Sequence, residues 1–231
     1  MKFSVPVFLS LNAGYVDTAG FLALQGLFTA HVTGNFVTLG AALVLGTSGI
    51  LAKLLALPVF CVVILVTRLL APALPRLGLP VLRSMLWIKL LLLAAGAAMA
   101  IWIGPGRQGS EPAVVVTGML LVSAMAIQNA ISRIHLGTAP PTTLMTGTTT
   151  QMMIDIADLL RGLPEDQRVA AKARLGRMGA NVGAFALGCA AGALLYSQFK
   201  MGCFVVPPLL ALVPLLMDAT REAPTPTGTG T

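Results

Sequence analysis

Long apolar stretches alternate with short polar ones along the whole chain. A helix needs about 20 mostly apolar residues to cross ~30 Å of hydrocarbon, and six stretches come close to that length: residues 4–28, 50–70, 84–104, 112–133, 175–197 and 201–217. Residues 35–46 and 147–160 are also helical in pattern, but they cover only ~16–20 Å at 1.5 Å per residue. The pattern predicts an all-α, polytopic membrane protein with about six transmembrane helices and two short re-entrant half-helices.

The two short segments are preceded by similar polar interruptions. Thr33-Gly34-Asn35 stands before the first and Thr146-Gly147-Thr148 before the second, 113 residues later. Each interruption follows an apolar stretch that contains a polar side chain, Asp17 in one case and Asn129 in the other. Three spans in each unit invert the second unit relative to the first, so we expect an inverted repeat of residues 4–104 and 112–217.

Composition supports a membrane location, because 56% of the 231 residues are hydrophobic and only 10% are charged. We expect residues 1–218 to form one transmembrane domain in contact with the lipid bilayer, and the Pro- and Gly-rich residues 219–231 to form a disordered cytoplasmic tail. If the short segments are re-entrant, all basic residues except Lys53, Arg107 and Lys200 lie on one face. That bias marks the face as cytoplasmic, together with both termini, and it explains the net charge of +7 without nucleic acid.

Four motifs carry a family resemblance: "GYVDTAGFL", "AHVTGN", "IQNAI" and "TTLMTGT", in this order. Together they resemble the YoaK-like family of bacterial inner-membrane proteins, a domain family of unknown function. The resemblance covers nearly the whole chain. It implies a multi-pass protein of six or seven spans in the bacterial inner (cell) membrane, and it implies neither a substrate nor a mechanism.

The threonines and glycines of the two interruptions suit breaks in helices. Backbone groups without partners are not tolerated against lipid, so each break must be buried in protein or line a wet cavity. We expect Thr33 and Thr146 to cap the following half-helices through their hydroxyls, while Gly34 and Gly147 let the chain turn. Either the breaks are structural only, or two helix amino ends converge on a site for an anion or a substrate carbonyl.

Asp17 lies well inside the first span, where a carboxylate is costly unless it is paired, hydrated or protonated. It is a candidate proton carrier, cation ligand or structural hydrogen-bond partner of the opposite repeat. Its counterpart Asn129, beside Gln128, does not ionise, whereas His31 can titrate near neutrality. The candidate substrate-binding residues are Asp17, His31, Thr33, Gly34, Asn35, Gln128, Asn129, Thr146, Gly147, Thr148 and Gln151.

Two further patterns each leave two interpretations open. A polar stripe on the second short helix, formed by Thr148, Gln151, Asp155 and Asp158, lines a cytoplasmic vestibule or pairs with the basic segment 161–177. Small residues four apart let helices touch closely. They serve packing within the chain or a homodimer interface, and they are Gly179, Gly183, Gly188 and Gly192.

No motif of a hydrolase, metalloprotease or nucleotide-binding enzyme occurs, so we expect no enzymatic activity. Cys61, Cys189 and Cys203 lie in apolar runs without metal-ligand spacing, and we expect no metal or other cofactor. The leading hypothesis is a transporter or permease for an unknown small-molecule solute, with its site between the two breaks. A passive channel and a non-transporting membrane assembly or sensor protein are the alternatives.

Overall fold

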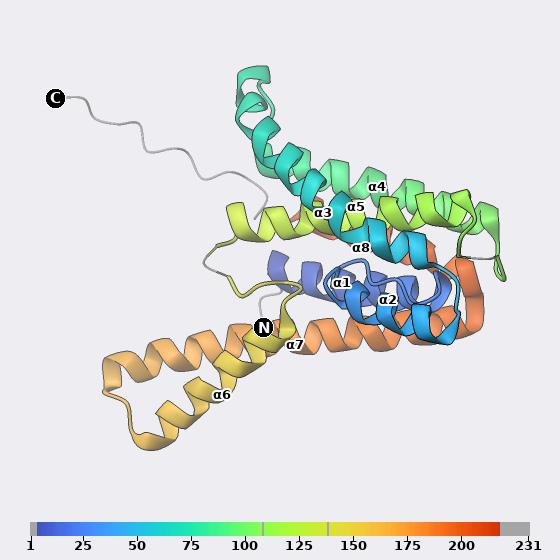
Figure 1. Cartoon of the computed structure of the whole chain (residues 1–231). Coiled ribbons are helices and arrows are strands. Elements are labelled where there is room, and N and C mark those ends of the chain that lie inside the picture. The colour runs from blue at the N-terminus through green and yellow to red at the C-terminus, as the bar shows by residue number, and fades with distance from the viewer. Residues whose placement is uncertain (1–3, 108, 138, 218–231) are drawn as a thin grey trace.

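The computed structural model describes residues 4–107, 109–137 and 139–217, and the predicted tail at 219–231 lies outside them. The described residues form helices and no strands, which confirms the all-α class (Figure 1). The helices are α1 (Val5–Ala23), α2 (Gly34–Leu45), α3 (Ile50–Leu70), α4 (Val81–Ile103), α5 (Pro112–Ile134), α6 (Met145–Arg161), α7 (Glu165–Phe199) and α8 (Val206–Leu216), with 3-10 turns η1 (Ala71–Ala73), η2 (Pro75–Leu77) and η3 (Lys200–Val205).

Several of these helices are built for a lipid environment. Among the described residues, four helical segments are long and apolar enough to cross a bilayer: Ile50–Ala73, Val81–Ile103, Pro112–Ile134 and Glu165–Leu216. The outward face of α3 is apolar, with Val62, Leu65, Val66 and Leu69 all exposed. Such a face is stable in hydrocarbon and unfavourable in water. The protein is therefore a membrane protein.

The helix bounds follow the sequence prediction closely, with two differences. α7 begins at Glu165 instead of residue 175, because a polar first turn continues an amphipathic helix that hydropathy does not detect. The segment predicted as one helix from residue 201 begins with the 3-10 turn η3 and becomes α-helical at Val206. Pro207 and Pro208 suit the first turn of α8, where their missing N–H groups need no partner.

The most extensive helix contact joins α1 to α7 through glycines. A Cβ atom at Gly14 or Gly188 would overlap a backbone carbonyl of the opposite helix, and one at Gly192 would come within 2.8 Å of the Tyr15 carbonyl oxygen. Gly188 and Gly192 are therefore used for packing within the chain. Gly183 has no atom within 4 Å of its Cβ position, so only the first half of the glycine series remains open to another molecule.

The remaining contacts arrange the other helices around α5. This helix packs against α3 and α4, and α8 packs against α1 and α4. α6 contacts α7, and Figure 1 shows that these two helices form a hairpin that extends away from the rest of the bundle. In the same view α2 lies toward the opposite end of the bundle from the hairpin.

The predicted topology is open to cysteine labelling in cells, after Cys61, Cys189 and Cys203 have been replaced. We expect Arg107→Cys to react with an impermeant thiol reagent added outside, since it lies on the predicted external side. Arg76→Cys and Ala170→Cys should react only after the membrane is permeabilised. External labelling at position 76 would contradict the topology and, with it, the inverted repeat.

Candidate functional site

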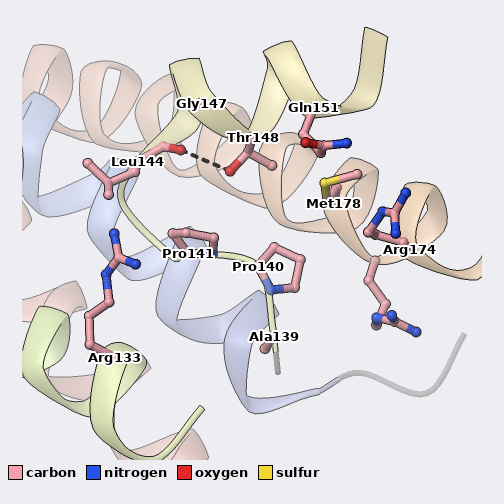
Figure 2. Close-up of a pocket in the computed structure, with 11 residues that line it drawn as sticks. Arg133, Ala139, Pro140, Pro141, Leu144, Gly147, Thr148, Gln151, Arg174 and Met178 are labelled. Atoms are coloured by element: carbon pink, nitrogen blue, oxygen red, sulfur yellow. Dashed lines mark hydrogen bonds between the residues drawn. The ribbon is translucent and has the colours of Figure 1, made fainter. Parts of the chain in front are cut away.

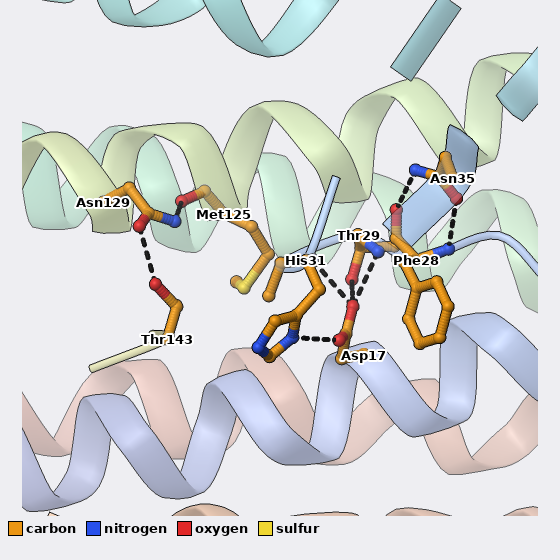
Figure 3. A network of polar contacts seen from close by, with 9 residues as sticks. Asp17, Phe28, Thr29, His31, Asn35, Met125, Asn129 and Thr143 are labelled. Carbon is orange, nitrogen blue, oxygen red and sulfur yellow. Dashed lines mark hydrogen bonds and ion pairs between the residues drawn. The ribbon is translucent and has the colours of Figure 1, made fainter. Parts of the chain in front are cut away.

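The carboxylate of Asp17 holds the irregular segment that joins α1 to α2. Its Oδ1 accepts hydrogen bonds from the backbone N–H groups of Thr29 and Ala30, both at 2.7 Å, and from the Thr29 hydroxyl at 3.3 Å. Its Oδ2 lies 2.7 Å from Nδ1 of His31 (Figure 3). A buried carboxylate with this many donors is compensated for the loss of water. Asp17 therefore ties the end of its own helix to the loop.

Asn35 closes the same loop from the side of α2. Its amide oxygen accepts a hydrogen bond from the N–H of Phe28, and its amide nitrogen donates to the carbonyl of Phe28, both at 2.8 Å. Asn35 is 1% exposed. Because its side chain replaces the partners that Phe28 would find in a regular helix, Asn35 acts on the loop backbone.

The loop between α5 and α6 is held in a related way. Asn129 accepts a 2.7 Å hydrogen bond from the hydroxyl of Thr143, and Gln128 donates to the hydroxyl of Thr142 at 3.2 Å. Each threonine lies fourteen positions after its partner, the same separation as between Asp17 and His31. The two halves of the chain thus use one register with different chemistry, a carboxylate in the first and amides in the second.

His31 lies where the two loops meet. Its ring is next to the backbone of Thr143 as well as to Asp17, and its edge packs against the ring of Phe185 with 5.4 Å between centroids. Figure 3 shows Asp17, His31, Thr143 and Asn129 in one region between helices from both halves. The side chain of His31 is 33% exposed, so it can reach a solute.

Three cavities follow the two loops and share lining residues. The first, about 490 Å³, is lined by Asp17, Gly34 and His31 among others. His31 also lines the second, of about 390 Å³, together with Thr33, Asn129 and Arg133.

Arg133 and Leu144 continue into the third cavity, of about 380 Å³, shown in Figure 2. Gly147, Thr148 and Gln151 line this third cavity. The predicted site residues are therefore distributed along connected cavities, and Asp17 and Gly147 lie in different ones.

The structure corrects the predicted roles of the two threonines. Thr33 precedes α2 in a helical conformation and makes no capping hydrogen bond through its side chain, because a capping residue needs extended dihedral angles. α6 begins at Met145, so Thr146 lies inside its first turn and its carbonyl accepts from Thr150. Thr146 lines a separate hollow, on the face of α6 that carries Met153 and Ile154.

The polar stripe of α6 serves both of the purposes that the sequence left open. Thr148 and Gln151 line the third cavity, whereas Asp155 pairs with Arg174 of the basic segment, which donates hydrogen bonds of 2.8 and 2.6 Å. These bonds, with one from Gln151, hold the pKa of the Asp155 carboxyl below its ordinary value. The pair fixes α6 on α7 and leaves Gln151 oriented beside the cavity.

Arg68, Arg133 and Arg177 were not among the predicted site residues, although all three line these cavities. The sequence pattern attributes them to topology, because arginines at helix ends usually record the cytoplasmic side. Their spacing from Asn129 and Thr148 was the available signal. Arg133 follows Asn129 by four residues and so lies on the same face of α5.

Comparison with known proteins identifies the family. A family model described as "Protein of unknown function (DUF1275)" matches residues 5–217, so the chain belongs to this family, of which the YoaK-like proteins are members. No curated protein and no solved structure matches the chain. The family assignment agrees with the resemblance in the four motifs.

The contacts of Asp17 predict that its charge is needed for the fold of the first loop. Asp17→Asn replaces an acceptor-only group by an amide, whose NH₂ faces at least one backbone N–H, and we expect a loss of about 1–3 kcal/mol of stability. Thermal unfolding of the purified protein in detergent measures this loss. Asp166→Asn is the matched control, because Asp166 is exposed. Equal unfolding temperatures for the two variants would contradict the role of Asp17.

Proposed function

We propose that this DUF1275 protein is a small-solute transporter or permease of the bacterial inner membrane, whose solute passes between the loops that precede α2 and α6. The observation that carries the proposal is the continuity of the three cavities along both loops. His31 joins the first cavity to the second, and Arg133 joins the second to the third.

The construction of the loops supports this proposal. Irregular backbone at membrane depth is stable only when it is buried in protein or lines a hydrated cavity, and here the loops do both. Their backbone groups are bound by Asp17 and Asn35 on one side. On the other side His31, Thr33 and Gly147 face the cavities. Broken helices from two halves that meet in this way are typical of secondary transporters.

Charge along the cavities favours polar or charged solutes over apolar ones. Arg133 and Arg177 line the third cavity beside the hydroxyl of Thr148 and the amide of Gln151. Asp17 faces the first cavity with its charge shared by His31 and two backbone N–H groups. The arrangement contains hydrogen-bond donors at both ends of the path, and we infer that these groups orient the solute.

Uptake into vesicles tests the proposal with a mixture of solutes. The purified protein is reconstituted into liposomes, a bacterial metabolite extract is added outside, and the washed contents are compared with those of empty liposomes by mass spectrometry over time. We expect at least one metabolite to accumulate faster with the protein. Arg133→Gln should slow that uptake several-fold, because Arg133 lines two cavities, whereas Arg83→Gln on the exposed surface of α4 should not.

The dependence of the initial rate on concentration separates the alternatives. A rate that saturates supports a carrier with a binding site, and a rate that stays linear supports the passive channel. If no metabolite enters vesicles that contain folded protein, the transport proposal is wrong and an assembly or sensor role takes its place.

A further inference from the structure

The apolar core of the bundle is divided into two clusters. One contains Leu9 of α1, Leu86 of α4 and Ile131 of α5, and the other contains Ala13 of α1 and Leu90 of α4. Along both α1 and α4 the clusters therefore meet within about one helical turn. The residues at this boundary are polar.

Four fully buried polar side chains occupy the boundary, and none is more than 1% exposed. We call them the Lys89 layer: Ser10 and Asn12 of α1, Lys89 of α4 and Gln128 of α5. Within the described residues, four atoms of this layer have no hydrogen-bond partner. They are Ser10 Oγ, Asn12 Oδ1, Gln128 Oε1 and Lys89 Nζ.

The helix contacts bring these side chains together. α5 and α8 each pack against both α1 and α4. Gln128 donates a 2.8 Å hydrogen bond to the carbonyl of Leu9 on α1, and Asn12 donates one of 3.2 Å to the carbonyl of Pro207 on α8. Lys89 stands three residues after Leu86 and four before Leu93, so its side chain leaves the inner face of α4.

The unpartnered atoms are complementary in number and kind. A lysine ammonium has three N–H donors and no acceptor, and the layer has three neutral oxygens without donors. Asn12 and Gln128 already use their amide nitrogens as donors, so it is their oxygens that lack a partner. A buried polar atom without a partner costs about 1–3 kcal/mol, which makes both parts of the layer unstable alone.

We propose that the Lys89 layer is an internal cation site, in which three oxygens from α1 and α5 hold the ammonium of Lys89 directly or through single water molecules. The ligand class of the site is a primary ammonium, supplied in this protein by its own lysine. The site joins α1 and α4 to α5, and thereby links the two halves of the chain. It is separate from the solute path, since no lining of the three cavities includes Ser10, Asn12 or Lys89.

Chemical rescue tests the site. Lys89→Ala removes the atoms that correspond to n-propylammonium, so we expect a lower unfolding temperature in detergent and partial recovery when millimolar n-propylammonium is added. The wild type and Lys89→Met, in which the methionine fills the same volume, should not respond. Equal concentrations of 1-propanol and tetramethylammonium are the controls for shape and for charge. Recovery with these controls, or no recovery with n-propylammonium, would overturn the proposal.

A second measurement covers the case in which Lys89→Ala does not fold. Lys89→Met leaves the three oxygens without a donor, and we expect it to unfold at a lower temperature than the wild type. Ser10→Ala removes one of those oxygens. Because both changes act on one network, the double variant should lose less than the sum of the two single losses. Additive losses, or a Lys89→Met variant more stable than the wild type, would show that the lysine has no such partners.

Discussion

The hydrogen bonds from the backbone N–H groups of Thr29 and Ala30 to Asp17 are the interaction on which the site depends. In a bilayer a loop backbone is unstable without internal partners, and a carboxylate is unstable without donors. Each group here removes the cost of the other. The bonds fix the loop against α1, place His31 beside the second loop, and allow α2 to begin at Gly34 in the interior of the protein.

Much of the architecture could be predicted from sequence, because hydropathy and the residues that interrupt helices act locally. The bounds of α2 and α6 lie within two residues of the predicted segments 35–46 and 147–160, since clusters of threonine and glycine interrupt apolar runs there. The partners of the polar side chains could not be predicted in the same way. The expected threonine caps do not form, and Asn35 instead binds Phe28 seven residues earlier, a contact that depends on the path of the loop.

Basic residues show a second limit of the sequence pattern. Lys89, Arg133 and Arg177 all count toward the cytoplasmic side, yet the structure gives them different surroundings. Lys89 is 0% exposed between two apolar clusters, and the two arginines line cavities. Charge statistics describe which side of the membrane a residue faces, whereas the face of its helix and the neighbouring helices decide whether it is buried. The arrangement of α1, α4, α5 and α8 was needed to recognise the Lys89 layer.

Cross-linking tests most directly the central claim that the two loops meet. In protein without its three native cysteines, His31→Cys and Thr143→Cys are combined with a protease site inserted between Gly104 and Glu111. A short bis-maleimide should then keep the two halves in one band after cleavage, because His31 lies beside Thr143. The pair of His31→Cys with Thr150→Cys, on the exposed side of α6, is the control. Separation of the halves in both pairs, or equal cross-linking in both, would contradict the meeting of the two loops.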